Sequence, residues 1–150
     1  MEQAERTKNK IAEAVEMIVG KENILSDYES VYAYSTDSTN IAKTEKLADI
    51  VVFPVNKYQV SAIMKFANEN KIPVTARAAG TSVCGACLPK CGGIILSLAK
   101  MDKIIEINKD NLICISEPGV VIEDLKKLQK ELSAIQIAVD KTNLTTPIEY

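Results

Sequence analysis

The segment from residue 77 to residue 89 holds the residue types and the spacing that could do chemistry. It reads Arg-Ala-Ala-Gly-Thr-Ser-Val-Cys-Gly-Ala-Cys-Leu-Pro and directly follows a run expected to form a strand. Small side chains let the backbone approach a ligand closely, and successive N–H groups in a turn can bind an anion. Thr81 and Ser82 add hydroxyl donors. The pattern predicts a diphosphate-binding loop, in which the amides of residues 78–82 converge on one point just past a parallel strand.

Two better-known phosphate patterns and all histidine chemistry are absent from the sequence. There is no Gly-x-Gly-x-x-Gly and no Gly-Lys-Ser/Thr, which disfavours a Rossmann NAD site and nucleotide hydrolysis. The chain contains no histidine, which excludes a histidine general base, a Ser-His or Cys-His nucleophile pair, and imidazole metal ligands. Chemistry must therefore come from a cofactor, from thiols or from another chain.

Three cysteines in the same segment admit two interpretations. Cys84, Cys87 and Cys91 follow the spacing Cys-x-x-Cys-x-x-x-Cys, with Cys114 available as a fourth. Such a set could hold Zn²⁺ or an iron–sulfur cluster. Alternatively, cysteine replaces other small residues in a loop whose shape the phosphate hypothesis already explains, and Cys114 is a core residue within a strand. We favour the second interpretation and assign no metal ligand.

Two charged residues near the loop have open roles. Arg77 could neutralise a phosphate or pair with a nearby carboxylate, and the sequence favours neither. Asp37 could cap a turn, which is the favoured role, or line the site.

Hydrophobic periodicity predicts the elements that must position this loop. Apolar residues at helical spacing predict three helices, over residues 5–19, 57–69 and 122–132. Short β-branched runs predict three strands, over residues 49–53, 72–75 and 94–98. Turn-forming residues between two further runs predict a hairpin, over residues 104–107 and 112–116. The expected fold class is α/β (α+β): a small, right-handed parallel β-α-β sheet with flanking helices plus a hairpin.

The remaining stretches are less informative. Residues 25–37 are irregular, and residues 133–150 have no clear period. The apolar stripes at 11–19 and 60–67 are expected to lie in the core. Because no linker divides the chain, residues 1–150 are expected to form a single domain.

Composition bounds the class of protein. Apolar residues make up 47% of the chain and charged residues 25%, an ordinary globular balance. A net charge of −2, scattered basic residues and few aromatic residues disfavour nucleic-acid binding. The sequence shows no signal peptide and no apolar run of membrane-spanning length. We expect a cytoplasmic protein without a membrane span, whose cysteines are reduced thiols or ligands.

Several separate motifs resemble one family in the right order and spacing. They are Tyr34–Asp37, Asn68–Ser82, Gly93–Leu98, Met101-Asp102, Ile104–Ile107 and Glu117–Val120. Together they resemble the FAD-linked oxidases of the vanillyl-alcohol oxidase and p-cresol methylhydroxylase type. Within that group the sequence is most similar to the glycolate oxidase D-subunit and D-lactate dehydrogenase branch. The resemblance covers residues from about 20 to 130 and implies the N-terminal part of a PCMH-type FAD-binding domain.

The resemblance implies a non-covalent FAD site, since the family's loop amides hold the pyrophosphate and no histidine is present for covalent attachment. The cofactor-binding residues that it implies are Ala78, Ala79, Gly80, Thr81, Ser82, Gly85, Ala86, Cys87, Pro118 and Gly119. The family more often has glycine where this chain has Ala78, so that this amide must be presented from an ordinary φ. We therefore retain FAD as the expected cofactor.

The implied function is the FAD-binding portion of a flavin-dependent oxidoreductase that acts on a 2-hydroxy acid such as glycolate or D-lactate. The family continues beyond the equivalent of residue 132 into a substrate domain, so the chain is expected to be truncated and no catalytic residue is assigned. Two alternatives stay open. One is a non-catalytic fragment or subunit, completed by a homodimer or by a partner chain that covers the missing half. The other is a cysteine-based metal-binding module.

Overall fold

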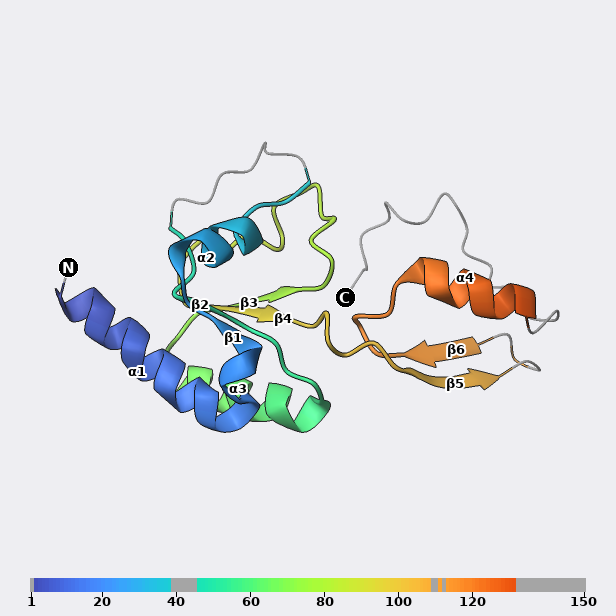
Figure 1. Cartoon of the computed structure of the whole chain (residues 1–150), viewed down its shortest axis with the longest axis horizontal. Coiled ribbons are helices and arrows are strands. Elements are labelled where there is room, and N and C mark those ends of the chain that lie inside the picture. The colour runs from blue at the N-terminus through green and yellow to red at the C-terminus, as the bar shows by residue number, and fades with distance from the viewer. Residues whose placement is uncertain (1, 39–45, 109–110, 112, 132–150) are drawn as a thin grey trace. The chain divides into compact units, whose positions relative to one another are not determined.

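The computed structural model describes residues 2–38, 46–108, 111 and 113–131 (Figure 1). The chain divides into two compact units, residues 1–101 and residues 102–150. Each unit is considered by itself. The single domain over residues 1–150 stays a prediction.

A four-stranded sheet forms the centre of the first unit. Its strands are β1 (Ile24–Leu25), β2 (Ile50–Val52), β3 (Val74–Arg77) and β4 (Ile94–Ser97), in the spatial order β1-β2-β4-β3. Strands β2, β4 and β3 run parallel, and the short β1 pairs antiparallel with β2. The predicted parallel sheet is confirmed, with three differences: β1 adds an antiparallel strand, β4 lies between the two strands of the β-α-β unit, and β3 begins at Val74 instead of residue 72.

The two central strands are completely buried, which explains their uninterrupted runs of apolar residues. Every residue of β2 and of β4 is buried, whereas β1 and most of β3 are half-buried. A strand covered on both faces needs no alternation of polar and apolar side chains. The sequence of each central strand therefore reflects its place between two layers of helices.

Helices cover both faces of this sheet. Helices α1 (Glu2–Val19) and α3 (Lys57–Glu69) lie on one side and α2 (Tyr28–Tyr34) on the other (Figure 1). A short 3-10 turn, η1 (Lys21–Asn23), leads from α1 into β1. Among the described residues, no helix is long and apolar enough to cross a membrane.

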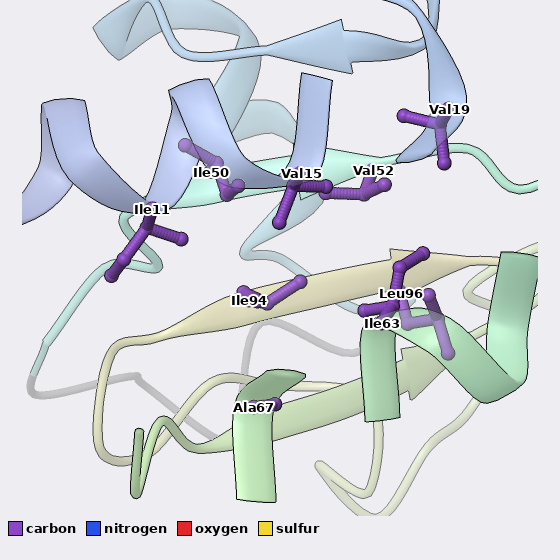
Figure 2. Close-up of a cluster of buried hydrophobic side chains, with 9 residues drawn as sticks. All are labelled: Ile11, Val15, Val19, Ile50, Val52, Ile63, Ala67, Ile94 and Leu96. Atoms are coloured by element: carbon purple, nitrogen blue, oxygen red, sulfur yellow. The ribbon is translucent and has the colours of Figure 1, made fainter. Parts of the chain in front are cut away.

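The main core lies between α1, α3 and the sheet. Figure 2 shows its buried side chains pointing toward one another: Ile11, Val15, Val19, Ile50, Val52, Ile63, Ala67, Ile94 and Leu96. The stripe predicted on α1 is confirmed, since three of its residues are four apart and buried. On α3 the prediction holds for Ile63 and Ala67, but Met64 is 46% exposed and lies outside the core.

Helix α2 occupies a stretch whose sequence shows no regular period. It begins because the Asp27 side chain accepts a hydrogen bond from the Ser30 backbone N–H at 2.8 Å, which caps the first turn. That contact holds the pKa of the Asp27 carboxyl below its usual value. Only Val31 of the helix is buried, so seven residues with one inward side chain leave no helical pattern to detect.

Ser97 gives a testable consequence of this packing. It is fully buried, and its hydroxyl has no hydrogen-bond partner among the described residues. Ser97→Ala is expected to raise the free energy of unfolding by about 1 kcal/mol, because it removes a desolvated hydroxyl. Urea denaturation followed by circular dichroism measures the change. The matched control is Ser35→Ala, since the buried Ser35 hydroxyl donates to the Val31 carbonyl at 2.8 Å. The control should destabilise, and a destabilised Ser97→Ala would contradict the expectation.

The second unit contains the predicted hairpin and helix. Strands β5 (Ile104–Asn108) and β6 (Ile113–Ser116) pair antiparallel with a bulge between residues 104 and 106, and α4 spans Ile122–Glu131. The hairpin exposes three large apolar side chains, Ile105, Ile113 and Ile115. Cys114 is half-buried within β6 and belongs to neither buried hydrophobic cluster, so its predicted core position is only partly met. Residues 133–150 lie outside the described part of the chain.

Candidate functional site

The predicted phosphate loop begins where the edge strand of the parallel sheet ends. Strand β3 ends at Arg77, whose register partner Ser97 is the last residue of β4. The carboxyl ends of parallel strands meet at one edge of a sheet, which is where α/β proteins bind ligands. The structure therefore places residues 78–82 at the edge that the sequence predicts for them.

The amides of this loop are available to a ligand. None of the N–H groups of residues 78–82 donates a hydrogen bond to an acceptor in the described part of the chain. Ala78, Ala79 and Thr81 are exposed, and Gly80 and Ser82 are half-buried. Gly80 has φ 73°, a left-handed conformation that favours glycine. Five consecutive donors at the carboxyl end of β3 thus have no partner among the described residues, and their convergence on one point stays a prediction.

Among the described residues Arg77 contacts main-chain carbonyls instead of a carboxylate, and its action on a phosphate stays a prediction. Its Nη1 donates to the backbone carbonyls of Tyr34 at 3.0 Å and Thr36 at 2.5 Å. The guanidinium also lies 5.6 Å from the centre of the Tyr34 ring. Its partners include main-chain oxygens and an aromatic face, and it joins β3 to the end of α2 and to the segment that follows. We call this set of contacts the Arg77 clamp.

Arg77 also packs against the backbone of the predicted phosphate loop. A Cβ atom built on Gly80 would lie 2.0 Å from Nη2 of Arg77 and 2.3 Å from its Cζ. The guanidinium therefore packs directly against the Gly80 backbone. Because this close approach and the positive φ both require glycine, position 80 is fixed by packing within the protein as well as by access for a ligand.

The segment after α2 supports the loop through further contacts. The Gly85 N–H donates to Oδ2 of Asp37 at 3.2 Å. The Ser38 N–H donates to the Ser82 carbonyl and the Ser38 hydroxyl to the Gly80 carbonyl, both at 3.4 Å. Asp37 therefore contacts the loop. The role of Ser38 was not predicted, and the one signal for this segment was the Tyr34–Asp37 motif in the resemblance.

The other predicted cofactor residues differ in accessibility. Gly85 and Cys87 are buried and Ala86 is exposed, and the Gly85 amide is already used by Asp37. Pro118 and Gly119 lie in the second unit, in the turn that follows β6, where Pro118 is exposed and Gly119 half-buried. There the Glu117 carboxylate accepts a hydrogen bond from the Lys103 N–H at 3.0 Å. The cofactor role of these residues stays a prediction.

The cysteines do not form one cluster. Cys87 is buried, and its Sγ accepts a hydrogen bond from Nη1 of Arg77 at 3.6 Å, whereas Cys84 and Cys91 are exposed. No group of three or more histidine, cysteine, aspartate or glutamate residues in the described part of the chain is placed to hold a metal ion. The geometry of these residues therefore gives no support to a cysteine-based metal module.

Residues 48–139 match a family described as FAD binding domain. Glycolate oxidase subunit GlcD of Bacillus subtilis is 30% identical over 115 residues, which are 77% of this chain and 24% of that protein. A D-lactate dehydrogenase of Archaeoglobus fulgidus is 41% identical over 95 residues, 62% of this chain and 21% of that protein. The chain thus spans less than a quarter of the length of these two relatives.

Solved structures show the same fold. The structure of p-cresol methylhydroxylase with substrate bound superposes with a TM-score of 0.74 and 25% sequence identity, over 84% of this chain and 25% of that chain. The 4-ethylphenol oxidase from Gulosibacter chungangensis superposes with a TM-score of 0.75 over the same shares, at 24% identity. The mixed α/β fold with its hairpin matches the N-terminal portion of PCMH-type FAD-binding structures.

Proposed function

The chain belongs to the FAD-binding domain family, and from that premise we propose that residues 78–82 bind the pyrophosphate of FAD without a covalent bond. One observation carries the proposal: five consecutive amides past the end of β3 have no acceptor in the described part of the chain. Unpaired amides cost free energy when they are removed from water, and a diphosphate would supply the missing acceptors. The small exposed side chains of Ala78 and Ala79 leave room for it.

The loop residues have distinct parts in this proposal. The amides would donate hydrogen bonds to the phosphate oxygens, the hydroxyls of Thr81 and Ser82 would add donors, and the Arg77 clamp would hold the backbone in place. A loop that is held in its binding conformation binds a ligand more tightly than a mobile loop, because no conformational entropy is lost on binding. FAD, when bound, supplies two-electron redox chemistry.

The substrate follows from the relatives alone. We propose that the whole protein oxidises a 2-hydroxy acid, because a glycolate oxidase subunit and a D-lactate dehydrogenase are among the proteins it resembles. The described residues provide half of a cofactor site at most, and no catalytic residue is assigned. Uptake of FAD, measured without substrate, is therefore the direct test.

The sharpest variant adds bulk to the loop without disturbing the core. Ala79→Leu should weaken FAD binding at least about tenfold, because its side chain blocks approach to the amides, while stability changes by less than about 0.5 kcal/mol. The matched control is Ala99→Leu, since Ala99 is also exposed and lies outside the loop. Titration with FAD, followed by flavin absorbance and fluorescence, gives both affinities. Equal binding by the two variants would contradict the proposed site, and no uptake by the unmodified chain would contradict FAD binding itself.

A second candidate function is a flavin-binding subunit that another polypeptide completes. The hairpin of the second unit exposes Ile105, Ile113 and Ile115, and a two-stranded sheet is marginally stable without further strands or a helix packed on it. A second copy of this chain is the simplest such partner. Sedimentation velocity with and without FAD tests this, since a monomer that binds FAD fully would contradict it.

A further inference from the structure

A cavity of about 480 Å³ lies between the free edge of β3 and the following loop. Its lining comprises Pro73, Val74, Thr75, Ala76, Cys84, Gly85, Ala86, Leu88, Lys90 and Cys91. The volume falls within the range of small-molecule sites. Two of the four thiols in the chain and one ammonium group border it. No carboxylate is among the lining residues, but Oδ2 of Asp37 accepts a hydrogen bond from the N–H of the lining residue Gly85 at 3.2 Å. The cavity therefore offers nucleophiles and a positive charge to a single ligand.

Cys84 has the environment of a reactive thiol. It is exposed, and its Sγ lies 3.4 Å from the Ser82 hydroxyl oxygen. The hydrogen bond from Ser82, followed by one from the Ala86 backbone N–H, lowers the pKa of the Cys84 thiol from its usual value. Hydrogen bonds to a thiolate increase the fraction of nucleophile present near neutral pH. Cys87 differs in being buried against Arg77.

One side of the cavity is formed by strand β3, at the edge that does not pair with β4. Strand β3 pairs only with β4 within this sheet. The Pro73 carbonyl accepts a hydrogen bond from the first residue of β4, and the Arg77 carbonyl accepts one from Leu98, which directly follows β4. By strand alternation the N–H and C=O groups of Val74 and Ala76 face the other way. Both residues line the cavity. An extended peptide could pair with these groups as an added strand.

We propose that this cavity is a modification site, in which Cys84 undergoes thiol–disulfide exchange with a short, anionic peptide disulfide. The peptide backbone pairs with the edge of β3, and its carboxylate lies against Lys90. The Cys84 thiolate attacks one sulfur of the disulfide, a new S–S bond forms, and the old S–S bond breaks. The electron pair leaves on the departing peptide sulfur, which takes up a proton from water. The peptide disulfide is the oxidant, so the proposal does not depend on FAD.

The test uses the full reduced chain without added FAD. Oxidised glutathione serves as the anionic peptide disulfide, and hydroxyethyl disulfide as a small neutral one. Mass spectrometry of peptides follows the mixed disulfide at each cysteine with time. Cys84 should react with oxidised glutathione about tenfold faster than Cys91, and Cys87 more slowly still. Cys84→Ser should remove the dominant adduct without creating an equally fast one at Cys91.

The charge contact is tested separately through Lys90→Gln. This variant should slow the reaction of Cys84 with oxidised glutathione at least about threefold, and leave the rate with hydroxyethyl disulfide unchanged. Circular dichroism verifies that each variant is folded. Two results would overturn the proposal. One is that Cys91 is modified more than Cys84; the other is that the Cys84 rate is the same with both disulfides and is unchanged by Lys90→Gln. In either case Cys84 would be only one exposed thiol among others.

Discussion

Replacing Gly93 by alanine is expected to lower the free energy of unfolding of the first unit by about 3 kcal/mol. Gly93 has φ 78°, and a Cβ atom there would lie 2.1 Å from the backbone carbonyl oxygen of Pro73. That same oxygen accepts the first hydrogen bond of β4, from Ile94 N–H at 2.8 Å. The new methyl group would therefore push β4 away from β3 at the point where their pairing begins.

Gly93 also contacts the segment that leads into β2, the strand on the other side of β4. Its N–H donates to Oδ2 of Asp49 at 2.9 Å, and its carbonyl accepts from the Asp49 N–H at 2.7 Å. These contacts precede β2, so a single residue sets the start of β4 against both neighbouring strands. Gly93 lies at the amino end of β4, and the predicted phosphate loop lies at the carboxyl end of the neighbouring β3. A displacement of β4 at Gly93 should therefore also weaken FAD binding.

The neighbouring glycine provides the control. Gly92 has nearly the same φ, 75°, but the three atoms nearest to a Cβ atom there belong to the Lys46 side chain, beginning with Cε at 2.9 Å. These atoms belong to the end of a long side chain, whereas the oxygen that a Cβ atom at Gly93 would meet belongs to the backbone. Gly92→Ala should cost only the backbone conformation, about 1–2 kcal/mol. Urea denaturation gives the free energy of unfolding of both variants, and the difference between them measures the cost of the clash with the Pro73 carbonyl. An equal loss of stability in the two variants would contradict the predicted clash.

The second large effect is expected at Arg77. Arg77→Met should lower the free energy of unfolding by about 2–3 kcal/mol, because two carbonyls lose a charged donor and Gly80 loses the group packed against it. FAD affinity should fall at least about tenfold, since the loop that presents the amides is no longer held. Denaturation and FAD titration measure the two effects on the same protein samples.

Arg77→Lys separates the charge from the geometry. Lysine keeps the positive charge but lacks the planar fork that contacts the Tyr34 and Thr36 carbonyls together. If the Arg77 clamp governs the loop, the lysine variant should resemble the methionine variant in both measurements. FAD affinity retained to within about twofold would instead indicate that Arg77 acts by its charge on the phosphate.

Local periodicity was sufficient for the long elements. Helices α1, α3 and α4 followed from helical spacing, because apolar side chains recur at the period of the helix that buries them. The two buried strands followed from their continuous apolar runs, and the hairpin from the turn-forming residues between two such runs. Helix α2 did not follow, since its first turn depends on the Asp27 cap and only Val31 is buried. The start of β3 was misplaced by two residues, as residue 72 is apolar although the pairing with β4 begins at Val74.

The candidate site likewise has features that the sequence predicted and features that it did not. The loop, its small residues and its place after a strand are local properties, and they were visible in the residue types alone. The partners of Arg77 were not, because the Tyr34 and Thr36 carbonyls are more than forty residues away in the chain. Backbone acceptors have no residue type, so no sequence pattern could have indicated them.

The amino-acid sequence by itself determined where the long helices, the buried strands and the hairpin form, and that a run of small residues follows β3. Local propensity and burial period depend on neighbours along the chain, and these need no tertiary information. Only the tertiary structure decided that β4 lies between β2 and β3, that Arg77 holds the loop, and that Cys84 and Cys91 share a cavity apart from Cys87. Each of these depends on contacts between distant segments, whose distances are set by the packing of the sheet and its helices.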